Sequence, residues 1–270
     1  MSTATRFFYQ FALTIGVFAI IWFLFSKLEA FKPQSFDRLN SETEKKLAEL
    51  VLESISKTNR AITSKGALPY LDSLKNKICE RSHLNADSIK LHLIKKSEVN
   101  AFALPDHNIV IYTGLIDYSA SAEEVAGVLA HEIAHIELDH VEKKLVKEIG
   151  LGMLLVLVSG DAGPDILREV VHALSSTAFD RGQESEADKQ GVHYLAKSNI
   201  DPRHLSNFLF RLSRDERIPE QLEWLSTHPD SKDRAAEILK LRKTVDFDTV
   251  PPLQTSWALV KERIRIESER

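Results

Sequence analysis

The stretch His131-Glu132-Ile133-Ala134-His135 indicates zinc chemistry. Four residues of α-helix turn the chain by about 400°, so His131 and His135 project from nearly the same face, where two imidazoles can bind one Zn²⁺. Glu132 lies about 60° around the helix from His135, so its carboxylate can take a proton from an attacking water. The alternative is an exposed helix that carries two histidines by chance, and the surrounding sequence must decide between these interpretations.

His140 is the nearest candidate for a third zinc ligand. Five helical residues beyond His135 turn it by about 500°, well off the face shared by the two histidines. An extended motif with three histidines would need Gly at position 138 and His at position 141, where this chain has Leu138 and Val141. We therefore interpret His140 as a surface or packing histidine.

Glu184-Ser185-Glu186-Ala187-Asp188 is a better source of the missing ligand. Glu184 and Asp188 share one helix face, and Glu186 points away from both. Glu184 could bind the metal while Asp188 accepts a hydrogen bond from a ligand histidine and fixes its tautomer. An ordinary acidic helix start explains the same spacing equally well, because acidic residues favour the first turn.

The residues before the histidines predict a helix that holds them rigidly. Ser121 and Glu124 have the spacing of a capping box, which places the helix start at Ser121. An apolar stripe then continues through Val125, Val128, Leu129 and Ile136. Gly127 interrupts this helix, where glycine costs about 1 kcal/mol relative to alanine, so it indicates either a close helix contact or a tolerated glycine.

The remaining pattern predicts a mainly helical α+β zincin domain with a small sheet. Helices are expected at 41–58, 67–81, 183–197 and 232–243, and Asp201-Pro202 predicts the start of another. Alternating apolar residues predict a strand at 88–94, and 100–104 and 108–113 supply further extended structure. The apolar run 149–158 is too short to span a membrane, which favours a buried helix over a membrane-dipping or substrate-covering segment.

The uncharged stretch Phe7–Phe25 predicts a membrane anchor. As a helix it would be about 28 Å long, close to the roughly 30 Å of a bilayer core. A cleaved signal peptide is the rival interpretation, but Leu28-Glu29-Ala30 is a poor cleavage site. We therefore expect an anchor at 1–30, a linker at 31–36, a catalytic domain at 37–245 and a peripheral tail at 246–270. The positive charge of Arg6 before the segment nearly balances that of Lys27 and Lys32 after it, so the positive-inside rule does not predict the orientation of the anchor in the membrane.

The composition limits the classes of partner that the chain is expected to bind. The net charge is −4 and the sequence pI is about 6.2, so no basic surplus indicates nucleic acid as a partner. Cys79 is the only cysteine, which excludes an internal disulfide and favours a small buried apolar side chain.

The order of several motifs resembles the membrane-associated gluzincin proteases, a family that includes the CAAX prenyl, HtpX, Oma-type and BepA-type proteases. The matching segments, over roughly residues 40 to 243, are Asn100–Pro105, Ile109–Leu115, Gly127–Ala130 before the HExxH, the ExxAD at 184–188, Asp201-Pro202, and Thr227-His228-Pro229 with Arg234. The chain departs from the family at Asp106-His107, where Gly-Gly is common. It also lacks the tetratricopeptide-like repeats of the BepA type and the several spans of the CAAX and HtpX types, so it resembles a small member of the Oma/BepA branch with a single anchor.

The resemblance implies one Zn²⁺ per chain, bound by His131, His135 and Glu184, with Glu132 as general base. It also implies a site role for His228, which could occupy the open zinc position in a latent state or polarise the substrate carbonyl. The alternative is a loop histidine held extended by Pro229.

The resemblance further implies support from Asp188 and from Arg234, which would hold the loop of His228 by an ion pair. A polypeptide substrate would lie extended along the exposed strand edge near Asn100, Ala101 and Phe102.

The expected function is a membrane-anchored endopeptidase for misfolded or misassembled envelope proteins, with its catalytic domain on the non-cytoplasmic side. A chaperone or assembly factor with the same fold is one alternative, although binding alone needs no Glu132. A structural zinc protein closed by His228 is the other.

Overall fold

The computed structural model describes residues 39–62, 67–215, 223–248 and 257–269, together with Gly16. The chain divides into two units, Met1–Arg38 and Leu39–Arg270, and every element below belongs to the second. The anchor predicted at Phe7–Phe25 and the linker at 31–36 lie outside the described residues, apart from Gly16. Among the residues that are described, no helix combines the length and apolar character needed to cross a bilayer.

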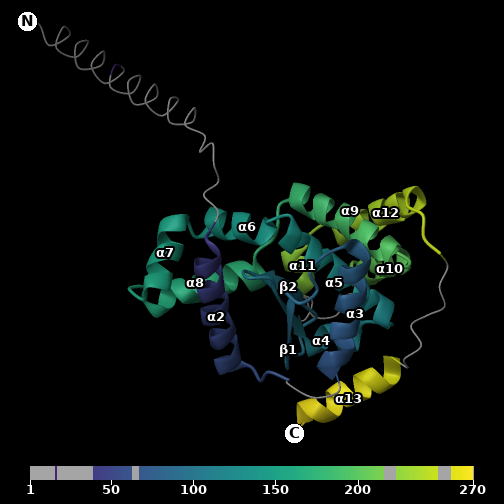
Figure 1. The fold of residues 1–270 in the computed structure, drawn as a ribbon, viewed down its shortest axis with the longest axis horizontal. Coiled ribbons are helices and arrows are strands. Elements are labelled where there is room, and N and C mark those ends of the chain that lie inside the picture. Colours follow the sequence, from purple (N-terminus) through teal and green to yellow (C-terminus); the bar gives the residue numbers. More distant parts are fainter. Residues whose placement is uncertain (1–15, 17–38, 63–66, 216–222, 249–256, 270) are drawn as a thin grey trace, which may run out of the picture. The chain divides into compact units, whose positions relative to one another are not determined.

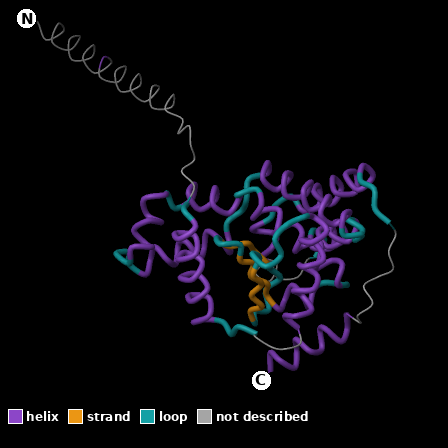
Figure 2. The backbone as a smooth tube through the Cα atoms, in the orientation of Figure 1, coloured by secondary structure: helices purple, strands orange, loops and turns teal. Residues whose placement is uncertain are grey.

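A mixed sheet of three strands lies at the centre of this unit (Figure 2). The strands are β1 (Lys90–Ile94), β2 (Ala101–Leu104) and β3 (Asn108–Tyr112), in the order β1-β3-β2. β1 runs parallel to β3 and β2 antiparallel to it, which makes β2 an edge strand. The strands predicted from sequence are therefore confirmed, within two residues at each end.

Helices cover both faces of the sheet, because successive residues of β3 enter two different apolar clusters. Ile109 and Ile111 join the cluster formed with α3 (Ala67–Ser82), α5 (Ala122–Glu137), α9 (Arg181–Lys197) and α10 (Arg203–Leu212). Val110 and Tyr112 join the cluster formed with α2 (Ser41–Thr58), α6 (His140–Glu148), α7 (Leu151–Ser159) and α8 (Pro164–Ser176). Figure 1 shows the second group of helices on the opposite side of the strands from the first.

Four shorter or later helices complete the fold: α4 (Thr113–Tyr118), α11 (Glu223–Thr227), α12 (Ser231–Leu241) and α13 (Trp257–Glu269). Val260 and Ile264 of α13 are buried in the first cluster, so part of the predicted peripheral tail packs onto the domain. The α+β prediction of a mainly helical domain with a small sheet is confirmed.

The prediction that the apolar run 149–158 is a buried helix is only partly correct. Leu154 and Leu157 of α7 are buried, but Met153, Leu155 and Val156 are 47%, 48% and 41% exposed. The reason is that α7 packs against α2, α6 and α8 through one stripe, and no described element covers its outer side.

The start and the packing of α5 agree with the sequence prediction, with one difference. The Ser121 hydroxyl accepts a hydrogen bond from Glu124 N–H at 3.4 Å, as a cap should. The Glu124 carboxylate instead accepts from Ala120 N–H at 2.7 Å and pairs in bidentate fashion with Arg211, so the capping box is only half formed. A Cβ added to Gly127 would lie 2.9 Å from Leu205 Cβ, which confirms the predicted close helix contact.

Candidate metal centre

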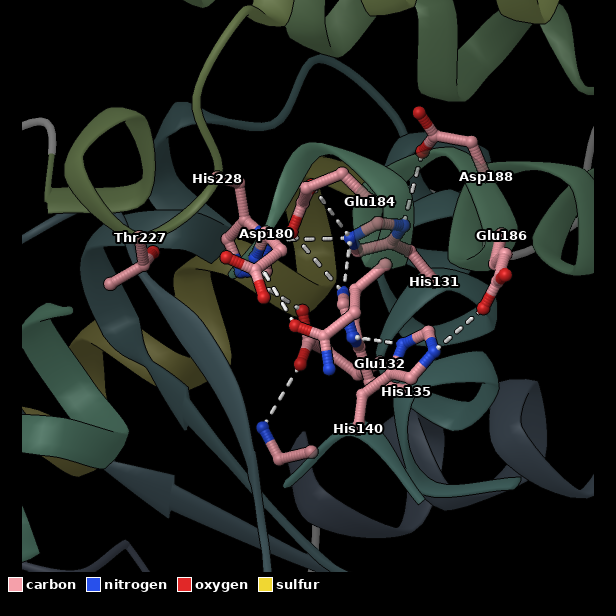
Figure 3. A network of polar contacts seen from close by, with 12 residues as sticks. His131, Glu132, His135, His140, Asp180, Glu184, Glu186, Asp188, Thr227 and His228 are labelled. Atoms are coloured by element: carbon pink, nitrogen blue, oxygen red, sulfur yellow. Dashed lines mark hydrogen bonds and ion pairs between the residues drawn. The ribbon is translucent and has the colours of Figure 1, made fainter. Parts of the chain in front are cut away.

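Four side chains from two helices and one loop converge on a single point beside the sheet (Figure 3). His131 and His135 come from α5, Glu184 from α9, and His228 directly follows α11. One ligand atom from each lies within 4.8 Å of all the others, and the described part of the chain holds no second such group. The sequence predicted all four residues, and the structure brings them together.

The spacing of these atoms fits a tetrahedral Zn²⁺. Bonds of about 2.0–2.1 Å place neighbouring ligands of such an ion about 3.3 Å apart. His131 Nε2 lies 3.0 Å from His135 Nε2 and 3.3 Å from His228 Nδ1. Glu184 Oε1 lies 2.9 Å from His228 Nδ1 and 3.4 Å from His135 Nε2. Three nitrogens and one carboxylate oxygen are a donor set that zinc prefers.

Burial prepares these groups to bind a cation. It lowers the pKa of His135 well below its usual value and that of His228 to about 4, so both imidazoles are neutral at pH 7. Burial alone would oppose ionisation of Glu184, yet His228 and Arg234 hold its pKa well below the usual range. Two neutral imidazoles and an ionised carboxylate are the protonation states that metal binding needs.

His131 is oriented as the sequence predicted. Its Nδ1 lies 3.1 Å from Asp188 Oδ1, so this nitrogen can donate to the carboxylate while Nε2 faces the centre. Asp188 is in turn bound by Arg234 through two contacts of 2.7 Å. Burial opposes ionisation of Asp188, but Arg234 outweighs it and lowers the carboxyl pKa to about 2.

Arg234 forms its ion pairs with carboxylates of α9 and not with the loop of His228 itself. Its guanidinium pairs with Glu184 as well as Asp188, so it supports two carboxylates of the same helix. The guanidinium is almost fully buried, with the side chain 8% exposed. It therefore supports the metal centre through the two carboxylates of α9, and its Nη2 also lies 3.4 Å from His131 Nε2.

The structure agrees with the interpretation of His140 as a packing histidine that is not a metal ligand, but its ring packs directly behind a ligand histidine. The residue is fully buried, and its Nδ1 lies 3.0 Å from Nδ1 of His135. Its Nε2 lies 3.2 Å from Glu186 Oε2, so the glutamate on the other face from Glu184 and Asp188 also contacts this network. The rotation argument assumed one continuous helix, whereas α5 ends at Glu137 and Asp139 adopts φ 57°, which turns the chain back towards His135.

Glu132 stands beside the four ligand residues without joining them. Its Oε2 accepts a hydrogen bond of 2.9 Å from Ala103 N–H of β2, and its Oε1 lies 3.5 Å from His228 Nε2. Burial, and then the charge of Glu184, raise the pKa of Glu132 well above its usual value. Its carboxylate is therefore fixed in place and readily protonated.

Aromatic rings and backbone hydrogen bonds hold His228 at the centre. The ring of Trp224 stacks on His228 at 4.0 Å between centroids, and Phe179 stacks on His135 at 3.9 Å. Phe179 N–H donates to Thr227 O at 3.2 Å, which ties the two segments together. Neither aromatic residue was predicted from the sequence, because Phe179 lies outside the motifs and the four-residue spacing of Trp224 and His228 does not show that their rings stack.

Lys144 of α6 is a second residue that the sequence analysis missed. It is 3% exposed, donates to Thr177 O at 2.6 Å and lies over the Phe179 ring at 4.2 Å. Burial lowers its pKa to about 8, although Glu132 and Glu184 favour its charged form. A cation at this place adds to the positive potential around both carboxylates.

The predicted substrate strand is an edge strand, but its edge is covered. Asn100 and Ala101 are fully buried and Phe102 is 1% exposed. Asn100 Nδ2 donates to Ser175 O of α8 at 3.1 Å, and α5 and α8 both pack against β2. The expectation of an exposed edge therefore does not hold in this conformation.

Comparison with known proteins identifies relatives of the described domain. Residues 68–242 match Peptidase family M48. The chain is 28% identical to the beta-barrel assembly-enhancing protease of Yersinia pestis, over 63% of this chain and 39% of that protein. It is 31% identical to the mitochondrial metalloendopeptidase OMA1 of Arabidopsis thaliana, over 57% and 32%, and 31% identical to the beta-barrel assembly-enhancing protease of Escherichia coli K12, over 62% and 37%. The matches thus span between about a third and two fifths of these curated relatives.

Proposed function

Because the chain belongs to Peptidase family M48, we propose that it is a zinc-dependent endopeptidase whose metal ligands are His131, His135 and Glu184. The observation that carries the proposal is the position of Glu132. This carboxylate is fully buried beside the four ligand residues, and its Oε1 lies 3.5 Å from His228 Nε2. A purely structural zinc site needs ligands alone and has no use for such a group.

Glu132 has the properties of a general base that later acts as an acid. When bound, zinc would polarise the scissile carbonyl and acidify water, whose pKa can fall to about 7 in such sites. Glu132 would accept a proton from the water as its oxygen attacks the carbonyl carbon. The same proton would then pass to the leaving nitrogen as the C–N bond breaks. A raised carboxyl pKa suits this double transfer, which contributes about 10²–10⁴-fold to such reactions.

We assign His228 to a latent state in which it occupies the fourth position. Its Nδ1 lies 3.3 Å from His131 Nε2 and 2.9 Å from Glu184 Oε1, within ligand distance of the same point. A catalytic zinc needs that position open for water and substrate. Movement of the segment 224–228 would open the site, and the released imidazole could then polarise the substrate carbonyl.

The substrate would pair with the outer edge of β2. Tyr112 N–H donates to Asn100 O at 3.0 Å, and bonded pairs alternate along an antiparallel ladder. The backbone groups of Ala101 and Ala103 therefore point away from β3, and Ala103 N–H already reaches Glu132. A peptide added to this edge would lie next to the general base, provided that α8 moves aside. Backbone pairing of this kind implies loose sequence specificity.

The setting of the activity is a further part of the proposal. The apolar stretch Phe7–Phe25 would anchor the chain in a membrane with the catalytic domain on its non-cytoplasmic side. Relatives are named for the assembly of β-barrels and for mitochondrial proteolysis, which supports misfolded or misassembled envelope proteins as substrates. A chaperone or assembly factor with little proteolysis is the alternative.

Cleavage of an unfolded protein separates these functions. The zinc-loaded chain should cleave casein, lose this activity with a chelator and regain it with Zn²⁺. Full cleavage in the metal-free state would contradict the zinc mechanism, whereas binding without cleavage would favour the chaperone.

His228→Ala tests the latent state, with His193→Ala, an exposed histidine of α9, as the matched control. The first should bind zinc less tightly and the second should match the unsubstituted chain. If His228→Ala changes neither cleavage nor zinc affinity, His228 has no role in the site.

A further inference from the structure

The two ligand histidines of α5 are supported in different ways. His131 Nδ1 meets the carboxylate of Asp188 directly, at 3.1 Å. His135 Nδ1 meets another imidazole, that of His140, at 3.0 Å. The far nitrogen of His140 then meets a carboxylate, Glu186 Oε2, at 3.2 Å (Figure 3).

We propose that His140 and Glu186 are positioning residues that hold His135 in the tautomer and orientation needed to bind zinc. The inference rests on the proposed metal site. It assigns each ligand histidine its own carboxylate from the single segment Glu184–Asp188, one reached directly and the other through His140.

The directions of the hydrogen bonds follow from one requirement. If His135 offers Nε2 to the metal, its remaining proton is on Nδ1, which must donate. His140 Nδ1 lies in hydrogen-bond range and has to accept, so the proton of a neutral His140 sits on Nε2. That nitrogen donates to the Glu186 carboxylate. Every imidazole nitrogen of the pair then has a partner, which matters because both rings are fully buried.

The fold places His140 for this contact. Helix α5 ends at Glu137, Asp139 takes a left-handed conformation with φ 57°, and α6 begins at His140. This turn brings the side chain behind His135, where a continued helix would have carried it away. Glu186 lies two residues from both Glu184 and Asp188 in α9, and its side chain is 63% exposed. Because solvent screens Glu186, we expect His140 to contribute more to zinc binding than Glu186 does.

Zinc affinity, measured by competition with a chromophoric chelator, tests the proposal without relying on proteolysis. Leucine fills a similar volume to histidine but can form neither hydrogen bond, so His140→Leu should weaken zinc binding by about 10–100-fold. His140→Gln retains an oxygen that can accept from His135 and an N–H that can donate to Glu186, so it should recover much of that loss. If Gln and Leu weaken binding equally, or if Leu leaves it unchanged, the positioning role is refuted.

A second pair of variants covers the case in which His140→Leu does not fold. Glu186→Ala should weaken zinc binding. The control Glu148→Ala, which removes an exposed glutamate of a different helix, α6, should not. Equal zinc affinities of these two variants would overturn the positioning role of His140 and Glu186. An unsubstituted chain that binds zinc but cleaves nothing would contradict the endopeptidase proposal without contradicting the positioning role of His140 and Glu186. An unsubstituted chain that binds no zinc would contradict both.

Discussion

Gly127→Ala should destabilise the domain, although alanine is the better helix former. A Cβ at this position would lie 2.9 Å from Leu205 Cβ, 3.1 Å from its Cα and 3.2 Å from its backbone nitrogen. Carbon atoms pack best at about 3.5–4.0 Å, so α5 and α10 would have to separate by several tenths of an ångström. Two of the three contacts are with backbone atoms, which cannot turn away as a flexible side chain can.

Gly191→Ala is the matched control, because it adds the same methyl group to another buried helix position. Its Cβ would meet the nearest atom, His131 N, at 3.5 Å, an ordinary contact. Both substitutions gain about 1 kcal/mol of helix propensity, so their difference isolates the overpacking at Gly127. That cost is typically about 1–3 kcal/mol, or about 2–12 °C in Tm for a domain of this size.

Thermal unfolding of the two metal-free variants measures this difference. Gly127→Ala should have the lower Tm, and Gly191→Ala should equal or exceed the unsubstituted chain. Because α5 also carries the ligand residues His131 and His135, Gly127→Ala should weaken zinc binding as well. Equal Tm values for the two variants would refute the reasoning about the contact between α5 and α10.

Two other predictions concern ionisable side chains with shifted pKa values. Arg234→Met leaves Glu184 and Asp188 without their cation and should cost about 3–5 kcal/mol of unfolding free energy. Because the pKa of Asp188 is lowered from 3.8 to about 2, the stability that its ionised form provides is present above pH 3.8 and is lost as the pH falls to 2. Denaturant titrations of Arg234→Met at several pH values should not show this loss. The same loss of stability at low pH in Arg234→Met would contradict the assignment. Burial, and then Glu142, raise the pKa of Glu44 from 4.5 to about 8, so the stability that the neutral carboxyl provides is present below pH 4.5 and lost as the pH rises through 8. Glu44→Gln should therefore gain stability relative to the unsubstituted chain between pH 5 and 8, and a difference independent of pH would exclude Glu44 as its source.

Local periodicity explains which features could be predicted. His131 and His135 lie within one uninterrupted helix, so counting rotation placed both on one face, and Ser121 marked its start. The same counting excluded His140 as a ligand but could not show its contact with His135, because it assumes a continuous helix and the chain turns at Asp139. A left-handed aspartate is uncommon, and nothing in the spacing indicated it.

Features that depend on tertiary packing could not be predicted from the sequence. Phe179 contacts His135 from more than 40 residues away and Trp224 contacts His131 from more than 90 residues away, and their apolar character fits any buried position. The apolar composition of α7 predicted a buried helix, but only Leu154 and Leu157 are buried, while Leu151 and Val158 are partly buried against the same cluster. Likewise, the order of strands made β2 an edge, while the covering of that edge by α5 and α8 follows only from the three-dimensional arrangement.

The most direct test of the metal centre is the pair of values obtained from Glu132→Gln: bound zinc per chain and the rate of casein cleavage. Glutamine has nearly the same size and can no longer take up the proton, while His131, His135 and Glu184 remain. The proposed mechanism predicts one zinc per chain and a loss of cleavage of about 10²-fold or more. A Glu132→Gln chain that retains its zinc and cleaves casein at the unsubstituted rate would contradict it.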